Sequence, residues 1–399
     1  MTAPAILAIN AGSSSLKFAL FAVASDGLSA ELRGKIARGE RHTAFEATDR
    51  NGAPLAVPVL PEVFSHAAAI GAIVELLSAR DLLPAIAAVG HRVVHGGGRF
   101  VAPIRLDAQV RAALSGFHHL APLHMPPALA GMTAVDTQLP GILQFACFDT
   151  AFHATMQELS RRLPLPERFA TAGLRRYGFH GLSYEHVAAS LPRLAGGRTP
   201  ARVIAFHLGA GASLCAMRDG CCVTTSMGFS TLEGLMMGTR SGSIDPGVIL
   251  HLLEHEGLSP ADISRLLYHE AGLRGVSGES GDMRALLASA TPAARLAIDM
   301  FCWRAASEAA ASLPALQGLD AIVFTGGVGE NAAPIRARIA AHLAFTGLQL
   351  DEGSNAVHAA AIDASTSAVR AWIVPADEEL TIARAALPLM EAGATHQGE

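Results

Sequence analysis

The sequence predicts an α/β fold in which one strand–turn–strand plan occurs twice. Residues 6–9 are apolar, 10–15 are small and polar, and 16–23 are again largely apolar, which is typical of a hairpin with a polar tip. Residues 203–206, 207–213 and 214–217 repeat this order. A third apolar run, 321–325, ends at a glycine-rich segment and follows an alanine-rich, helix-like stretch from about 296 to 313. Alternating strands and helices predict the α/β class.

The two hairpins indicate an internal duplication. Gly12 and Gly209 align if the second turn carries one extra residue. Loops at strand ends are where α/β proteins hold their ligands. We therefore expect functional residues near the glycine-containing loops 10–15, 209–213 and 326–331.

The length of 399 residues predicts more than one domain. Two Pro/Gly-rich zones, 122–127 and 191–200, separate longer periodic segments, and a new unit begins near residue 149. The last periodic segment, 378–390, predicts a helix that returns to pack on the first domain. We expect one domain from 1–148 plus 380–399, and a second from 149–379.

Composition argues against several classes of function. With 30 Lys+Arg against 35 Asp+Glu and only 16% charged residues, no basic field exists for nucleic acid or an anionic membrane. No apolar stretch reaches the roughly 18 residues of a membrane span, and no targeting segment is recognised. The five cysteines contain no C-x-x-C pattern and predict neither a disulfide framework nor a zinc ribbon. A cytoplasmic protein is expected.

The first hairpin tip, residues 10–17, combines small residues, three serine hydroxyls and Lys17. Consecutive backbone N–H groups of small residues can face an anion, so phosphate is the expected guest. Lys17 is one of only two lysines in a chain that otherwise uses arginine, which singles it out as a compact positive charge beside this loop. The alternative is an ordinary polar turn.

Four further side chains stand at junctions between apolar and glycine-rich segments. Arg92 and Arg240 lie in nearly uncharged, glycine-flanked surroundings, where a planar guanidinium suits phosphate or carboxylate. Asp149 and His180 follow apolar runs, where a titratable group is poised for chemistry. Structural ion pairs, helix caps and core residues remain the alternatives.

Other phosphate-binding and hydrolytic motifs are missing. Neither a Walker A loop nor a G-x-G-x-x-G fingerprint occurs, and no G-x-S-x-G nucleophile elbow is present. His251 and His255 match the H-x-x-E-H pattern of some zinc peptidases, but no segment supplies an obvious third ligand. No zinc site is predicted.

Six motifs together resemble the acetate kinase family, the acetate/propionate or short-chain acyl kinases. They are Asn-Ala-Gly-Ser-Ser-Ser-Leu-Lys from Asn10, Gly-His-Arg-Val-Val-His-Gly-Gly from Gly90, Phe-Asp-Thr-Ala-Phe-His from Phe148, Tyr-Gly-Phe-His-Gly from Tyr177, Leu-Glu-Gly-Leu-Met-Met-Gly-Thr-Arg-Ser-Gly from Leu232, and Gly-Val-Gly-Glu-Asn from Gly327. The resemblance spans nearly the whole chain. It implies a duplicated actin-like, sugar-kinase-like (ribonuclease H-like) fold of two domains with a cleft between them.

The resemblance also implies roles for residues. Asp149 becomes the catalytic acid/base, and His180 and Arg240 stabilise the transferring phosphoryl group. Asn10 and Glu378 become the residues linked to Mg²⁺, for which Mn²⁺ is a possible substitute. The acyl substrate is held by Arg92 and lined by Val94, Leu123, Phe179 and Thr231. The nucleotide contacts are Lys17, His207, Leu208, Gly209, Ala210, Gly211, Asp282, Met283, Arg284, Gly327, Val328, Gly329, Glu330 and Asn331.

This sequence departs from the family pattern at three positions. Met125 and Ala210 stand where the family usually has Asn, and Thr231 stands where it usually has Pro. Ala210 lacks a side-chain amide next to the nucleotide, and Thr231 changes the wall of the acyl pocket. These departures concern affinity and substrate choice rather than reaction class.

The resemblance therefore predicts an ATP-dependent phosphotransferase with a carboxyl acceptor, an acetate kinase that makes acetyl phosphate and ADP reversibly, and a homodimer. A propionate kinase is one alternative. A non-catalytic, nucleotide-binding actin-like protein is the other, since Ala210 and Met125 depart from the pattern.

Overall fold

The computed structural model describes residues 3–12, 15–25, 27–39, 43–197 and 199–395, with side chains described up to residue 390. Contacts divide the chain into two units, residues 1–151 with 377–399, and residues 152–376. The expected boundaries assign Asp149 and Glu378 to the second domain, but the contacts assign both to the first unit. The reason is local: the Asp149 amide donates to the Val93 carbonyl, and the helix that begins at Glu378 packs on the first sheet.

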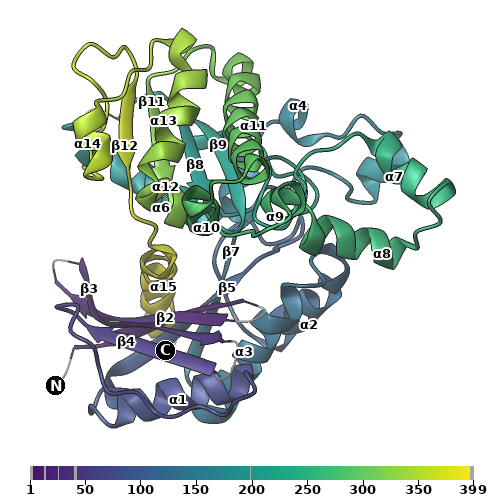
Figure 1. Ribbon diagram of the computed structural model, residues 1–399. Coiled ribbons are helices and arrows are strands. Elements are labelled where there is room, and N and C mark those ends of the chain that lie inside the picture. The colour runs from purple at the N-terminus through teal and green to yellow at the C-terminus, as the bar shows by residue number, and fades with distance from the viewer. Residues whose placement is uncertain (1–2, 13–14, 26, 40–42, 198, 396–399) are drawn as a thin grey trace. The chain divides into compact units, whose positions relative to one another are not determined.

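The first unit is a sheet covered by helices on both faces (Figure 1). Its strand order is β4-β3-β2-β1-β5-β7-β6, in which β1 to β4 form an antiparallel meander and β1, β5 and β7 are parallel. The elements are β1 (Ala5–Ala11), β2 (Ser15–Ala24), β3 (Gly27–Arg38), β4 (Thr43–Asp49), α1 (His66–Ser78), β5 (Ile86–Val93), β6 (Ile104–Arg105), α2 (Ala108–Gly116), α3 (Met125–Gln138), β7 (Leu143–Phe148) and α15 (Glu378–Thr395).

The second unit has a smaller sheet of order β10-β9-β8-β11-β12. Its elements are α4 (Glu158–Arg161), α5 (Glu167–Thr171), α6 (Gly181–Leu194), β8 (Arg202–Leu208), β9 (Ala212–Arg218), β10 (Cys221–Thr225), α7 (Pro246–Glu254), α8 (Pro260–Arg265), α9 (Gly272–Ser277), α10 (Met283–Ala288), α11 (Pro292–Leu316), β11 (Ala321–Thr325), α12 (Gly326–Asn331), α13 (Ala333–His342), α14 (Glu352–Ala356) and β12 (Arg370–Ile373).

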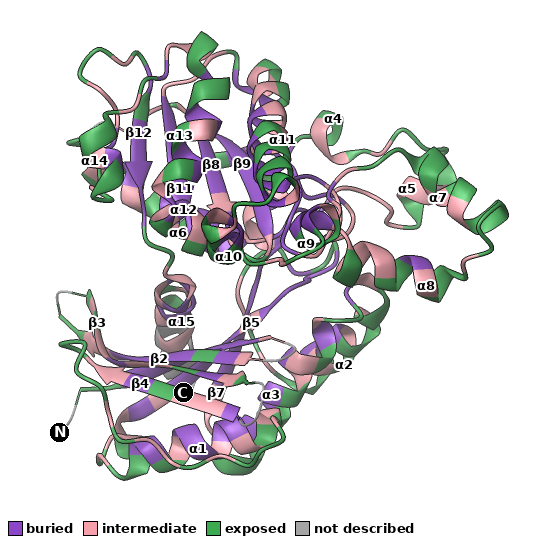
Figure 2. Ribbon diagram, viewed as in Figure 1, coloured by how far each residue is buried: buried purple, intermediate pink, exposed green. Residues whose placement is uncertain are grey.

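The two sheets share a five-stranded core, which confirms the predicted α/β class and the repeated hairpin. In each core, three antiparallel strands are extended by two parallel strands on the other side of the first strand, and the first sheet adds β4 and β6 at its edges. β1, β7, β9 and β11 are almost entirely buried, which is typical of central strands (Figure 2).

Close approach of α15 to the first sheet explains a glycine in β5. A Cβ built at Gly90 would lie 2.4 Å from Cγ2 of Ile382 on α15, a distance that real Cβ atoms do not show. The glycine therefore lets the last helix pack directly on β1, β2 and β5. This is the predicted return of the final helix. It places Glu378, at the start of α15, in the same unit as Asn10 and Arg92.

Two local expectations need correction. Segment 326–331, expected as a loop, is the short helix α12, because Gly326 adopts φ 78° and turns the chain directly after β11. The zone 191–200 was expected to separate segments, but α6 continues to Leu194 with Pro192 inside it. None of the helices in the described ranges is long and apolar enough to cross a bilayer.

Candidate active site

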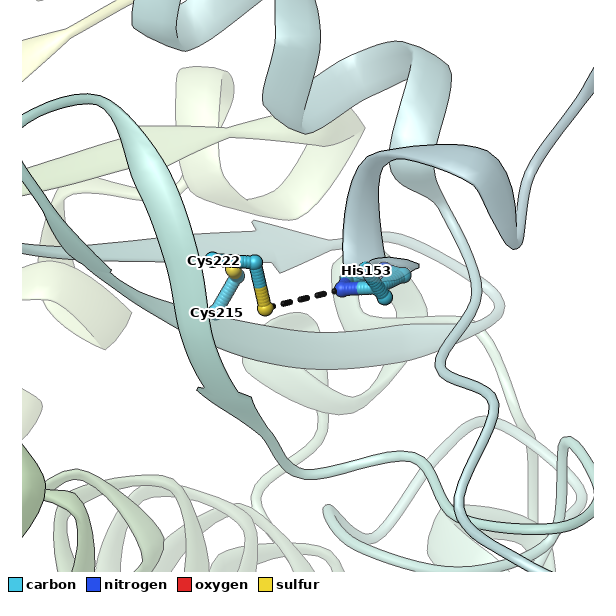
Figure 3. A group of neighbouring side chains, drawn as sticks. All are labelled: His153, Cys215 and Cys222. Atoms are coloured by element: carbon cyan, nitrogen blue, oxygen red, sulfur yellow. Dashed lines mark hydrogen bonds between the residues drawn. The ribbon is translucent and has the colours of Figure 1, made fainter. Parts of the chain in front are cut away.

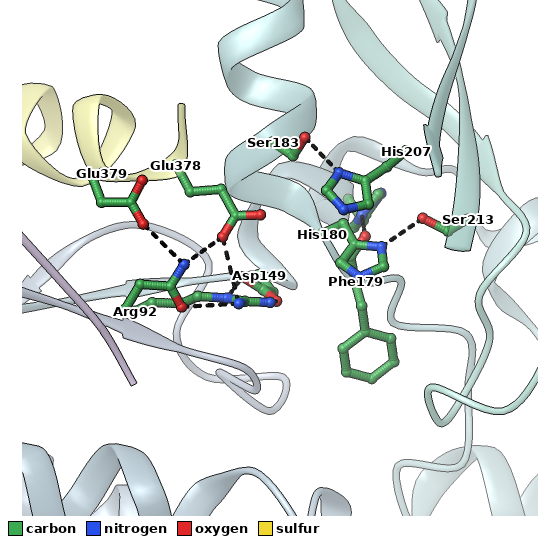
Figure 4. A network of polar contacts seen from close by, with 11 residues as sticks. Arg92, Asp149, Phe179, His180, Ser183, His207, Ser213, Glu378 and Glu379 are labelled. Atoms are coloured by element: carbon green, nitrogen blue, oxygen red, sulfur yellow. Dashed lines mark hydrogen bonds and ion pairs between the residues drawn. The ribbon is translucent and has the colours of Figure 1, made fainter. Parts of the chain in front are cut away.

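Polar side chains of the first unit gather where its parallel strands end. Asn10 lies near the end of β1, Arg92 near the end of β5, and Asp149 directly follows β7. Glu378 and Glu379 open α15 (Figure 4). Because carboxyl ends of parallel strands share one sheet edge, three separate sequence motifs deliver their side chains to one place.

Arg92 is the centre of this group. Its Nε donates to Asp149 Oδ1 at 2.9 Å and its Nη2 to Oδ2 at 2.6 Å, while Nη1 donates to Asn10 Oδ1 at 3.0 Å. Nη1 also lies 3.4 Å from Glu378 Oε2. Burial alone lowers the pKa of Arg92, but the charges of Asp149, Glu378 and Glu379 outweigh it, so the net effect raises the pKa. The guanidinium is firmly charged and strongly bound to acidic partners.

Negative charge is in excess around Asn10. Its Nδ2 donates to Glu378 at 2.8 Å and to Glu379 at 3.3 Å. Burial and the neighbouring charge of Glu378 raise the pKa of Glu379, and Lys17 only partly offsets this. Mg²⁺ prefers carboxylate and carbonyl oxygens, so this oxygen-rich, acidic group fits a divalent cation.

Lys17 lies on β2 and pairs in register with Asn10 of β1. At the tip between these strands, the Gly12 amide donates to the Ser15 carbonyl at 2.7 Å. Ser13 and Ser14, two of the hydroxyls expected to face phosphate, lie outside the described residues.

In the second unit, two histidines stack beside the second glycine turn. His180 precedes α6 with φ 59°, a left-handed conformation that is strained for a residue with a Cβ. Its Nδ1 is 2.8 Å from the hydroxyl of Ser213, which also contacts the hydroxyl of Tyr184. The ring stacks on that of His207 at 4.3 Å, and Nδ1 of His207 is 2.9 Å from the Ser183 hydroxyl (Figure 4). Both imidazoles are therefore fixed in orientation.

Arg240 is a half-buried cation with unusual surroundings. Its contacts are the Thr231 carbonyl at 3.2 Å, the Met237 sulfur at 3.8 Å and the Tyr268 ring at 6.0 Å. Among the described residues, no carboxylate forms an ion pair with it. Burial lowers the pKa of Arg240, with only a small opposing effect from Tyr268. An arginine in this environment suits an anion that arrives from outside.

The glycine turn brings His180 and Arg240 together. A Cβ built at Gly211 would lie 3.5 Å from His180 Nε2 and 3.9 Å from Arg240 Nη1. The two cationic or potentially cationic groups therefore border the turn that joins β8 to β9.

A cavity of about 620 Å³ in the second unit is lined by most of the residues predicted to contact the nucleotide. Its size is that of a typical small-molecule site. The expected residues that line it are Gly209, Ala210, Asp282, Met283, Arg284, Gly327, Val328 and Asn331. The expected residues that do not line it are Lys17, His207, Leu208, Gly211, Gly329 and Glu330.

Sequence reasoning missed several cavity residues. Gly238 and Gly281 belong to two loops in backbone contact, since a Cβ at either would lie within 3.0 Å of the other's carbonyl oxygen, at 2.9 and 2.7 Å. Gly238, Thr239 and Gly281 lie within two residues of Arg240 or Asp282, and Ala332 follows Asn331, so their positions beside predicted residues were the available signal. The other lining residues that were missed carry no such signal and are Leu273, Leu287 and Phe301.

The predicted acyl-lining residues are divided between the units. Val94 and Leu123 belong to the first unit, and Phe179 and Thr231 to the second. Three are buried, and Leu123 is 42% exposed.

The histidines of the H-x-x-E-H pattern lie at the end of α7, with ring centroids 5.1 Å apart. Nε2 of His251 lies 3.5 Å from an oxygen of Glu256, which is an ion-pair contact within this surface segment.

Comparisons with known proteins agree with the motifs. Residues 5–384 match the Acetokinase family. Acetate kinase of Nitrobacter hamburgensis is 45% identical over 388 residues, which cover 96% of each chain. Acetate kinase of Rhodopseudomonas palustris is 44% identical over 393 residues, covering 97% of this chain and 99% of the relative.

Solved structures give the same result. A propionate kinase from Francisella tularensis superposes with a TM-score of 0.89 at 34% identity, covering 96% of this chain and 98% of that chain. Porphyromonas gingivalis acetate kinase superposes with a TM-score of 0.86 at 36% identity, covering 97% and 100%. The chain belongs to the acetokinase family.

Proposed function

We propose that this protein is an acetate kinase, which transfers the terminal phosphoryl group of ATP to the carboxylate of acetate and forms acetyl phosphate and ADP reversibly. The environment of Arg240 carries the proposal. Its half-buried guanidinium has no carboxylate partner among the described residues and borders, with His180, the glycine turn at Gly211. Phosphoryl transfer needs such positioned positive charge on the equatorial oxygens.

The nucleotide binds in the second unit. Leu273, Met283, Leu287 and Phe301 offer apolar surface to a base, while the backbone at Gly209 and at residue 327 allows close approach of phosphates. Ala210 lines this cavity without the amide that the family usually has there, so weaker nucleotide affinity is expected. Lys17 is the further residue proposed as a phosphate contact.

The residues proposed to act on the carboxylate of the acceptor, Asp149 and Arg92, belong to the first unit. Asp149 serves as the acid/base residue, and its bidentate contact with Arg92 fixes the carboxylate in orientation. Arg92 holds the acyl carboxylate. Val94, Leu123, Phe179 and Thr231 are the residues proposed for the acyl group, and propionate is the alternative substrate because Thr231 replaces the usual proline.

Asn10 and Glu378 hold Mg²⁺, with Mn²⁺ as a possible substitute. The excess of carboxylates around Asn10 supports this assignment. When bound, the ion supplies charge neutralisation and orientation of phosphate oxygens.

The function is tested by trapping acetyl phosphate as its hydroxamate in the presence of ATP, Mg²⁺ and acetate. Arg240→Ala should lower kcat by roughly 10²-fold or more, the cost of losing one preorganised charge stabiliser. Arg218→Ala is the matched control, because the side chain of this exposed arginine hydrogen-bonds to the Ala315 carbonyl at the surface, away from the cavity. A protein that binds ATP but forms no hydroxamate would instead be the non-catalytic nucleotide-binding alternative.

A homodimer in the cytoplasm, without nucleic-acid or membrane partners, completes the proposal. The net charge of −5 and the sparse charged residues support the exclusion of polyanionic partners. Light scattering across a concentration series tests the dimer, and a constant monomer mass contradicts it.

A further inference from the structure

Three buried side chains of the second unit form a cluster that the proposed reaction does not use. His153 lies in a short 3-10 turn (Ala151–Thr155), Cys215 in β9 and Cys222 in β10. One ligand atom from each lies within 4.8 Å of the others (Figure 3). The three residues are 1%, 0% and 0% exposed. Among the described residues, no other group of three His, Cys or acidic side chains has its donor atoms this close together.

The imidazole is oriented as metal-binding histidines are. Nε2 of His153 is 2.9 Å from the Phe179 carbonyl oxygen, which can only accept, so Nε2 carries the proton. Nδ1 then presents its lone pair toward the cluster and lies 3.1 Å from Cys222 Sγ. A ring N–H donated to a backbone carbonyl, with the other nitrogen facing the ion, is the usual outer-shell arrangement.

Local packing keeps these donors together. Cys215 and Cys222 come from paired antiparallel strands, with Cys222 opposite Met217, two residues from Cys215. Both sulfur residues share a hydrophobic cluster with Tyr184 of α6. A soft, low-polarity site with two sulfurs and one imidazole nitrogen selects thiophilic ions over Mg²⁺.

We propose that His153 Nδ1, Cys215 Sγ and Cys222 Sγ bind one thiophilic closed-shell metal ion, Cu⁺ or Zn²⁺. Zn–S and Zn–N bonds of about 2.3 and 2.0–2.1 Å require donors only a few ångströms apart, as these are. Cys222 releases a proton to solvent when it binds Cu⁺, which leaves one thiolate and one cation. Zn²⁺ displaces the protons of both thiols, which again gives a neutral buried site, with water as a fourth ligand.

The site does not include the proposed catalytic residues, but it contacts the backbone next to one of them. The Phe179 carbonyl that accepts from His153 belongs to the residue before His180. The proposal does not depend on the proposed activity, because its measurements are of metal binding.

The test uses the full chain, reduced and stripped of metal under anaerobic conditions. Cu⁺ is titrated against a chromophoric Cu⁺ chelator and Zn²⁺ against a chromophoric zinc chelator. We expect each chain to bind one Cu⁺ or one Zn²⁺ ion. The ion that the protein takes from its chelator more effectively is the one that the site prefers. Binding of neither ion by the folded parent protein overturns the proposal.

Variants locate the ion. Cys215→Ser and Cys222→Ser should each weaken binding by about 100-fold or more, beyond the roughly 10- to 100-fold loss seen for outer-shell partners. Cys221→Ser, exposed and adjacent in sequence, and Cys302→Ser, buried elsewhere, are matched controls that should bind as the parent does. Unchanged affinity in both cluster variants overturns the assignment.

X-ray absorption on the metal-loaded parent protein keeps the proposal testable if the cluster variants fail to fold. A first shell that contains sulfur and nitrogen supports the site. A shell of oxygen and nitrogen alone places the ion elsewhere and overturns it.

Discussion

Arg92 and Asp149 form a bidentate ion pair within the first unit, with Nε 2.9 Å from Oδ1 and Nη2 2.6 Å from Oδ2. The Asp149 side chain is 0% exposed and that of Arg92 is 20% exposed. A carboxylate that has lost its water depends on its partner for charge compensation. The pair therefore joins the proposed acid/base residue to the proposed substrate-binding residue.

Arg92→Ala should destabilise the protein by roughly 2–4 kcal/mol, because removal of one partner leaves a buried charge and the partial exposure of Arg92 moderates the cost. In the Arg92→Ala, Asp149→Ala double variant, the loss should be smaller than the sum of the single losses by about 1 kcal/mol or more. Urea unfolding measures all three. Arg162→Ala, on the exposed pair with Glu167, is the control and should change little. Strict additivity would show that the pair is not coupled.

The proposed metal site makes a prediction about Mg²⁺ dependence. Glu378→Ala removes a carboxylate that contacts both Asn10 and Arg92, so the Mg²⁺ concentration for half-maximal activity should rise about tenfold or more. Asp377→Asn is the matched control. It loses charge in the ion pair with Arg33 but retains an oxygen for the Leu380 amide. Equal Mg²⁺ curves for Glu378→Ala and the parent protein would reject Glu378 as a ligand.

Because His91 is buried, we expect the folded protein to lose stability in mildly acidic solution. The residue is 2% exposed and its Nε2 is 2.8 Å from Gln144 Oε1. Burial, with a smaller effect from Arg111, lowers its pKa from 6.5 to about 4, although the contact with Gln144 opposes this. Between these values the unfolded chain binds a proton that the folded protein does not, so stability falls as pH falls from 6.5 to 4. The contribution is roughly 3 kcal/mol.

Unfolding of His91→Gln across this pH range is the measurement. The variant should lose less stability on acidification than the parent protein does. His119→Gln, at an exposed histidine, should follow the parent curve. Parallel curves for His91→Gln and the parent would exclude His91 as the source.

The parts of the fold that the sequence predicted are those that depend on local patterns of apolar and polar residues. The hairpins β1–β2 and β8–β9 follow from apolar runs around small polar turns, and α11 follows from an alanine-rich stretch. Parallel pairing of β5 with β1 depends on contacts distant in sequence, and no local pattern reveals it. The family was identified from six long motifs, most of which lie at strand ends, whereas those from Tyr177 and Leu232 lie in loops or before α6.

Residues whose role depends on tertiary packing could not be predicted in this way. Leu273 and Phe301 line the cavity only because α9 and α11 pack together. The cluster of His153, Cys215 and Cys222 comes from three segments without a metal-binding spacing, so the absence of C-x-x-C gave no signal for it.

Thr231, proposed to line the acyl group, contacts Arg240, proposed to stabilise the phosphoryl group. Its carbonyl accepts from Nη1 of Arg240 at 3.2 Å, and its side chain is buried. The family usually has proline here, whose ring bounds the pocket rigidly. Threonine lacks the ring and adds a hydroxyl, so both the shape and polarity of the wall change.

We expect measurable turnover of propionate by the parent protein, and a shift toward acetate in Thr231→Pro. One methylene in an apolar pocket is worth about 1–3 kcal/mol, or roughly 10- to 200-fold in kcat/KM, so a modest change of wall can reorder the two acids. Thr231→Val, which removes the hydroxyl without adding a ring, separates polarity from shape and should shift the preference less. The kcat/KM values for acetate and propionate are compared in all three proteins. The same acetate-to-propionate ratio in the parent and in Thr231→Pro would rule out Thr231 as the determinant.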